Sequence, residues 1–184
     1  VVSDVVCPWC YIGKRRLEKA MQQAAGRYAF EIEYHPFELN SEMPEKGVSQ
    51  RRYLVNKFGS EAQYEQVIQH TTAVAAQEGL TFNFDKQLVS PNTRSMHVLL
   101  NAAKSKGLQL QLTEAFFKAY FTDGVDLSKK ENIIAIAVQI GFDADEARTL
   151  IESDVHKYNI ATAELQNQNM GIRGVPYYII NNRY

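Results

Sequence analysis

Residues 3–18, SDVVCPWCYIGKRRLE, contain both cysteines of this 184-residue chain. Cys7 and Cys10 are separated by Pro8 and by Trp9, which is the only tryptophan. After the second cysteine, apolar residues recur at steps of three and four as far as position 24. This spacing predicts a helix that begins at the cysteine motif and runs to about residue 26.

The cysteine motif has the chemistry of a reactive dithiol. Pro8 suits the first helical position, which places Cys7 at or near the N-cap. There the free N–H groups and the helix dipole favour a thiolate over a thiol. Cys10 lies one turn further, within bridging reach and better covered by the helix. The motif therefore predicts Cys7 as the nucleophile, Cys10 as the resolving thiol and Trp9 as an exposed ring beside the sulfur.

Two other interpretations of the cysteine pair carry less weight. A zinc site needs four ligands, and the histidines at positions 35, 70, 97 and 156 show no paired spacing that would complete one. A purely structural pair fits poorly with a helix start that bears Pro-Trp. We therefore expect no metal and no cofactor beyond a redox-active Cys7–Cys10 disulfide.

Composition predicts a soluble protein that binds neither nucleic acid nor membrane. The net charge is -1, the basic residues are dispersed, and no apolar run approaches the roughly 20 residues that span a bilayer. The sequence starts at Val1 and stops directly after an apolar run, so we expect the natural chain to continue at both ends. We expect a cytoplasmic location, where a lone cysteine pair is more often catalytic than structural.

The two ends of the chain have strand-like patterns, and the middle is helical. Residues 28–34 alternate apolar and polar side chains, which predicts a half-buried strand, and residues 175–180 predict a strand buried on both faces. Three capping boxes mark helix starts between them: Ser60 with Gln63, Ser128 with Glu131, and Asp143 with Glu146. We expect residues 1–40 and 155–184 to form one discontinuous α/β domain, truncated at both ends, into which residues 41–154 insert an all-helical domain.

Four segments, SDVVCPWCYIGKRRLE, YHPFELN, PNTRSMH and GIRGVPYYIINNRY, resemble the DsbA-like thioredoxin superfamily, in particular its FrnE-like branch of dithiol-disulfide oxidoreductases and isomerases. The resemblance implies a thioredoxin fold interrupted by a large all-α-helical domain. It also implies that Pro176 is cis and that Val175 faces the active-site cysteine, offering backbone hydrogen bonds to a substrate. It leaves open whether Asp4 is the acid often found near the second cysteine.

The leading hypothesis is a thiol-disulfide oxidoreductase or isomerase acting on protein or small-molecule thiols and disulfides. The alternative is a glutathione-dependent isomerase or transferase of the kappa or 2-hydroxychromene-2-carboxylate type, which the chain also resembles. It would use glutathione as a co-substrate and Asn92, Arg94 and His97 as pocket residues. The competing interpretation of those three residues is a helix start with a hydrogen-bonded histidine. The sequence specifies neither the oligomeric state nor the direction of electron transfer.

A third hypothesis is a redox-sensing or interaction module without catalysis. Its docking surface would be the aromatic stretch of Phe116, Phe117, Tyr120 and Phe121. Aromatic residues at helical spacing are more often core, and we expect these four to be buried.

Overall fold

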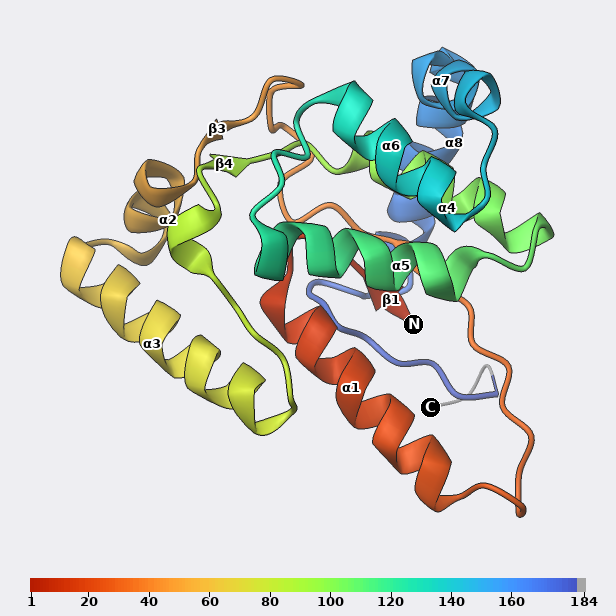
Figure 1. Ribbon diagram of the computed structural model, residues 1–184, viewed down its shortest axis with the longest axis horizontal. Helices are drawn as coiled ribbons and strands as arrows, with labels where there is room; N and C mark the ends of the chain where they lie inside the picture. Colours follow the sequence, from red (N-terminus) through yellow and green to blue (C-terminus); the bar gives the residue numbers. More distant parts are fainter. Residues whose placement is uncertain (182–184) are drawn as a thin grey trace.

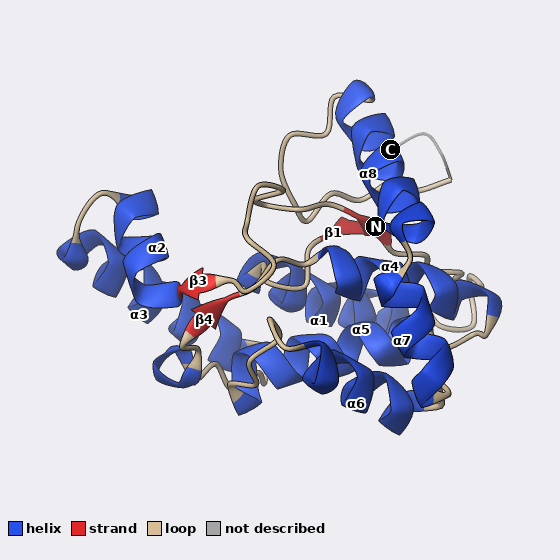
Figure 2. Cartoon of the chain, turned by 90° about the horizontal axis from the view of Figure 1, so that it is seen from above, coloured by secondary structure: helices blue, strands red, loops and turns tan. Residues whose placement is uncertain are grey.

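The computed structural model describes residues 1–181 and is mostly helical (Figure 1). In chain order its elements are β1 (Val2–Ser3), α1 (Pro8–Gln23), β2 (His35–Pro36), β3 (Val48–Ser49), α2 (Gln50–Phe58), α3 (Glu61–Gln77), the 3₁₀ turn η1 (Phe84–Lys86), β4 (Val89–Ser90), α4 (Arg94–Ser105), α5 (Gln109–Lys118), the π-helical turn η2 (Ala119–Asp123), α6 (Lys130–Ile140), α7 (Ala144–Glu152) and α8 (Asp154–Asn169). Seen from above, α2 and α3 lie at one end of the molecule and α7 and α8 at the other (Figure 2).

A short sheet leads into the cysteine-bearing helix. β1 pairs in parallel with β2, Val2 opposite His35. Val2 also forms an antiparallel bridge to Tyr177, with N···O distances of 2.8 and 3.0 Å in the two directions. β1, at the start of the chain, therefore pairs with two segments that are distant from it in sequence, β2 and the segment around Tyr177. α1 begins five residues after β1 ends.

The strand predicted over residues 28–34 is wrong. β1 pairs with β2 instead, and residues 28–34 have no ladder partner among the described residues. Tyr28 and Phe30 are exposed, so the alternating pattern has no buried face at this point. Only Tyr34, at the end of the pattern, is buried, and its N–H donates to Gln109 Oε1 at 2.8 Å.

The apolar run at residues 175–180 is not buried on both faces, which corrects the second strand prediction. Only Tyr177 takes part in a bridge, and its side chain is exposed, as are those of Ile179 and Ile180. The segment runs alongside α1 (Figure 1). Its inner side faces α1 at Gly13, where Pro176 and Tyr178 approach the helix backbone closely.

Two of the three helix starts predicted from capping-box spacing are confirmed, each by its N-cap hydrogen bond. Ser60 Oγ accepts from the N–H of Gln63 at 3.2 Å and starts α3, and Asp143 Oδ1 accepts from the N–H of Glu146 at 2.9 Å and starts α7. The third is wrong: α6 starts two residues after Ser128, whose hydroxyl donates to the Asp126 carboxylate instead. The antiparallel pair of β3 and β4 also interrupts the segment that we expected to be all helical.

The aromatic residues that follow the start of α5 form the centre of the core. Phe116, Phe117 and Phe121 are fully buried, as predicted, and the ring of Tyr11 on α1 stacks on Phe117 with centroids 4.8 Å apart. Burial of each such side chain contributes roughly 1.5–3 kcal/mol. The π-helical turn η2 ends α5 and buries both Tyr120 and Phe121.

A charged cluster reinforces the contact between α1 and α5. The Glu114 carboxylate on α5 accepts from Tyr11 Oη at 2.7 Å, from Lys14 Nζ at 2.6 Å and from the Arg15 guanidinium. Lys14 is buried, and Glu18 is its second partner. Packing and charge together hold the cysteine-bearing helix against the helical part of the molecule.

None of the helices within residues 1–181 has the length and apolar character needed to cross a bilayer. That same part of the chain contains no group of three or more His, Cys, Asp or Glu side chains placed to hold a metal ion.

Candidate active site

Cys7 occupies the N-cap of α1, with φ -90° and ψ 112°, and Pro8 holds the first helical position. The Cys7 carbonyl accepts from the N–H of Cys10 at 3.1 Å, which closes the first turn. The Cys7 N–H donates to the Asp4 carbonyl at 3.1 Å. This geometry confirms the predicted helix start and turns the Cys7 sulfur toward the free N–H groups of that turn.

The surroundings of Cys7 lower the pKa of its thiol. The largest cause is a hydrogen bond from the Cys10 side chain, and the backbone N–H groups of Cys10 and Trp9 act in the same direction. Burial and the negative charge of Asp4 raise the pKa and oppose this effect without cancelling it. The net result favours the Cys7 thiolate, the reactive form of cysteine.

The pKa of Cys10 moves the other way, well above its usual value. Burial is the main cause, followed by the hydrogen bond to Cys7 and the charge on Cys7; a hydrogen bond with Ser3 lowers it in part. The two cysteines are both free thiols. Cys7 is therefore the sulfur that loses its proton more easily, and Cys10 is the sulfur that retains its proton.

The C-terminal segment lies directly beside this dithiol. The Val175–Pro176 peptide bond is cis, as the family resemblance implies. Cys7 Sγ is 3.6 Å from the Val175 carbonyl oxygen, to which the thiol donates. Gly13 permits this arrangement: a Cβ there would lie under 3.0 Å from Tyr178 Oη and 3.3 Å from Pro176 Cγ.

A cavity of about 270 Å³ opens beside Cys7. Cys7 and Trp9 border it from α1, Leu54 from α2, Ile68 from α3 and Tyr120 from η2. Only 4% of the Cys7 surface is exposed. Because Cys7 is a lining residue, the part of its surface that remains accessible faces the cavity.

Trp9 is 39% exposed, which confirms the predicted exposed ring next to the dithiol. The centroid of its indole ring lies 6.0 Å from the centroid of the His70 imidazole on α3.

A family model, the DSBA-like thioredoxin domain, matches residues 1–184. The chain belongs to this family. The DSBA-like assignment covers all four segments on which the resemblance was based, and the fold is a thioredoxin core with helices inserted.

The chain is also similar to individual proteins. The crystal structure of a probable DsbA oxidoreductase from Streptomyces coelicolor is 29% identical, with a TM-score of 0.91 over 100% of this chain and 80% of that one. The cytosolic disulfide reductase DsbM from Pseudomonas aeruginosa with GSH is 15% identical, with a TM-score of 0.70 over 99% of this chain and 85% of its own. The uncharacterized protein YwbO of Bacillus subtilis is 24% identical over 182 residues, 98% of this chain and 84% of YwbO.

Asp4 is the buried acid next to the DSBA-like dithiol. Its Oδ2 accepts from the N–H of Leu39 at 2.8 Å, and its Oδ1 lies 3.3 Å from Nε2 of the buried His97. That nitrogen is also 3.1 Å from the Phe37 carbonyl oxygen. Asp4 borders the cavity as well, so its charge acts on Cys7 from the side on which a substrate would enter.

The three residues named for the alternative pocket are not among those that line the cavity. The Asn92 amide donates to the Met43 carbonyl at 2.8 Å, and Arg94 pairs with Glu38 at 2.5 Å. His97 is hydrogen-bonded as described above. Their positions match the interpretation of a helix start with a hydrogen-bonded histidine.

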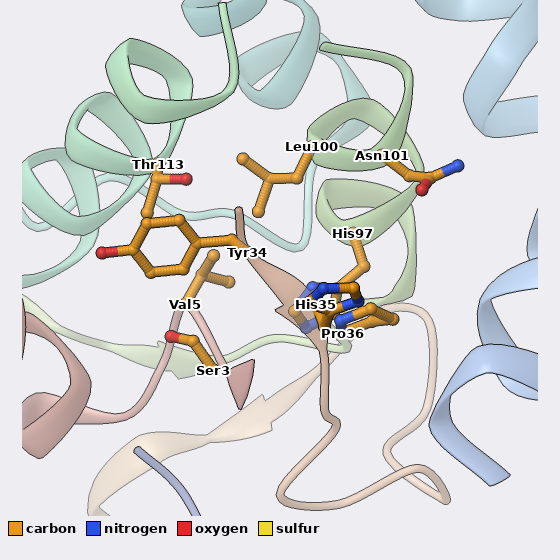
Figure 3. A pocket seen from close by; sticks show the side chains of 9 residues that line it. All are labelled: Ser3, Val5, Tyr34, His35, Pro36, His97, Leu100, Asn101 and Thr113. Atoms are coloured by element: carbon orange, nitrogen blue, oxygen red, sulfur yellow. The ribbon is translucent and has the colours of Figure 1, made fainter. Parts of the chain in front are cut away.

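A second, much smaller pocket lies between the β1–β2 sheet and helix α4. Its volume is about 10 Å³, the space of roughly one water molecule, so it is too small for a substrate. His97 and Leu100 reach it from α4, and Ser3 and Val5 from β1 and the segment that follows (Figure 3).

Sequence reasoning missed most of the cavity wall. Part of it comes from α2, α3 and the turn after η1, which contribute Tyr53, Leu54, Val67, Ile68, Thr71 and Gln87 among others. On α3 the apolar positions recur at helical spacing, which is the same signal that a core-facing helix gives. Only the placement of α3 beside Trp9 converts that pattern into a substrate wall.

Proposed function

We propose that this DSBA-like protein is a thiol-disulfide oxidoreductase and isomerase in which Cys7 attacks and Cys10 resolves. The Cys7 thiolate attacks one sulfur of a substrate disulfide, forms a mixed disulfide and releases one substrate thiolate. Cys10 then loses its proton, attacks Cys7 Sγ and expels the second substrate thiolate, which leaves a Cys7–Cys10 disulfide. Two electrons pass to the substrate, and the reverse sequence oxidises a substrate dithiol.

The observation that carries this proposal is the opposite pKa shift of the two sulfurs at one helix start. Two of the causes that raise the pKa of Cys10 come from Cys7, namely its charge and its hydrogen bond. Both are lost once Cys7 is bonded to substrate. Cys10 therefore becomes easier to deprotonate at the stage when it must attack.

Val175 supplies the main-chain contact for a substrate. Its carbonyl oxygen lies 3.6 Å from Cys7 Sγ, in the bend that contains the cis Val175–Pro176 bond. A substrate segment held there by backbone hydrogen bonds, like an added strand, would present its sulfur to Cys7.

The proposal includes thiols and disulfides of proteins or small molecules as substrates, glutathione as a co-substrate and a cytoplasmic location. The likeness to a cytosolic disulfide reductase with GSH supports the last two.

The test is insulin reduction with dithiothreitol as electron donor. Cys7→Ser is expected to lose the enzyme-dependent rate. Cys10→Ser is expected to accumulate a mixed disulfide on Cys7 because nothing resolves it. Arg148→Ser, an exposed change on α7, at the end of the molecule opposite α2 and α3, serves as the control and should keep the full rate. A Cys7→Ser variant that reduces insulin as fast as the wild type refutes the proposal.

The glutathione-dependent isomerase or transferase stays a prediction with its own outcome. It requires glutathione-dependent turnover of an aromatic substrate that survives Cys10→Ser. The redox-sensing alternative requires a Cys7 pKa close to that of a free thiol, which an absorbance titration of the thiolate measures.

A further inference from the structure

The cavity beside Cys7 contains a buried hydrogen-bond donor that the protein itself does not use. Gln87 follows η1, borders the cavity and is only 4% exposed. Its Nε2 atom is buried and has no hydrogen-bond partner within the described part of the chain. Buried polar groups are nearly always paired, so an unpaired amide at the wall of a cavity points to a ligand oxygen as the missing partner.

The remainder of the wall favours an apolar ligand. Leu54, Phe58, Val67, Ile68 and Phe84 line it together with the Trp9 ring. With 270 Å³ available, the cavity exceeds the engineered cavity of about 150 Å³ that holds a benzene molecule. An alkyl chain of several carbons therefore fits beside the sulfur.

The charges around the cavity disfavour a strongly anionic ligand. Lys57 is the only Lys or Arg among the lining residues that the structure describes, and its Nζ lies 5.8 Å from the centroid of the Tyr53 ring. The Asp4 carboxylate is negative and is already engaged by Leu39 and His97. A carboxylate inside the cavity would bury its charge without a partner, which costs free energy, so the carboxylates of a glutathione co-substrate would have to stay outside the cavity.

We propose that the cavity binds the substituent of a small thiol–disulfide couple, an apolar chain that ends in a neutral acceptor oxygen hydrogen-bonded to the Gln87 amide. This inference rests on the proposed function and names the redox partner of the same site. One thiolate of the partner attacks Cys7 Sγ in the Cys7–Cys10 disulfide, and Cys10 leaves and is protonated. A second thiol of the partner attacks the mixed disulfide and expels Cys7, so two electrons enter the protein.

The test compares three reductants of the oxidised protein. Dihydrolipoamide has two thiols, an alkyl chain and a terminal carboxamide; octane-1,3-dithiol has the same carbon chain without the amide; dithiothreitol is small and polar. Reduction is followed by acid quench, alkylation and mass measurement at increasing reductant concentration. We expect dihydrolipoamide to reach half-saturation at a concentration at least tenfold lower than dithiothreitol.

Two variants and a control locate the effect. Gln87→Leu should raise the half-saturating concentration of dihydrolipoamide about fivefold, the effect of one lost neutral hydrogen bond, and leave octane-1,3-dithiol unchanged. Val67→Phe narrows the cavity and should weaken both apolar dithiols by a larger factor than it weakens dithiothreitol. Gln69→Leu, an exposed change on the same helix as Val67, should alter none of them. Thermal unfolding checks that each variant is folded.

The inference is overturned if dihydrolipoamide saturates no earlier than dithiothreitol, or if Gln87→Leu affects both apolar dithiols equally. In either case Cys7-dependent reduction by dithiothreitol would still support the proposed function. If no reductant gives a Cys7-dependent reaction, the proposed function fails and this inference fails with it.

Discussion

Replacing Gly13 with alanine tests how closely the C-terminal segment must approach the dithiol. The added Cβ would lie under 3.0 Å from Tyr178 Oη and 3.3 Å from Pro176 Cγ. Ordinary contact begins near 3.4 Å, so the Tyr178 hydroxyl has to retreat by at least about 0.4 Å, and Pro176 Cγ stays in a tight contact with the new Cβ. Overpacking of this kind costs about 1–3 kcal/mol, whereas alanine in place of glycine gains up to about 1 kcal/mol of helix propensity. We expect a net loss of about 1 kcal/mol.

Removing the hydroxyl should reverse that loss. In a Tyr178→Phe background the nearest remaining atoms are Pro176 Cγ at 3.3 Å and the ring carbon Cζ at 3.5 Å, both close to ordinary contact. Gly13→Ala should then be neutral or stabilising. Urea unfolding of the four proteins gives the coupling free energy, and insulin reduction should fall in Gly13→Ala and recover in the double variant. The reasoning is refuted if Gly13→Ala changes stability equally in both backgrounds.

Three further predictions concern charges. Asp4→Asn removes a negative charge that raises the pKa of Cys7, so thiolate absorbance at 240 nm should appear at lower pH than in the wild type; an unchanged titration contradicts this. Burial raises the pKa of Glu38 from 4.5 to about 7, so its contribution to stability is complete below pH 4.5 and is lost as pH rises through 7. The free energy of unfolding should fall by up to about 3 kcal/mol over this range, and Glu38→Gln should flatten that slope in denaturant titrations. Glu114→Gln, which leaves the cations of α1 short of a partner, should cost about 1–2 kcal/mol in urea unfolding, against less than about 0.5 kcal/mol for the exposed Asp123→Asn.

The sequence predicted the helix start at the cysteine motif well because its determinants are local. Proline after Cys7, a three-residue step to Cys10 and an amphipathic helix behind them are enough to place one sulfur at an N-cap. The helix starts at Ser60 and Asp143 were predicted correctly for the same reason. The one at Ser128 failed because Asp126, two residues earlier, offered its hydroxyl a competing acceptor.

The strands were harder to predict because they depend on partners that are distant in sequence. A period-two pattern at residues 28–34 indicates a strand only if another segment pairs with it, and β1 pairs further along, at His35. The position of Asp4 likewise depends on His97, which is 93 residues away. The cavity depends on how α2 and α3 lie against α1, which no local pattern encodes.

The sulfur chemistry and the substrate wall come from different stretches of the chain. β1, α1 and the Val175 segment set the protonation of the dithiol, whereas α2, α3 and the two irregular turns η1 and η2 supply much of the apolar part of the cavity wall. If the proposed function holds, substitutions in the second set should change the substrate preference and leave the first set intact. A chimera that carries α2 and α3 from a relative should inherit that relative's substrate preference and keep the acid strength of the Cys7 thiol.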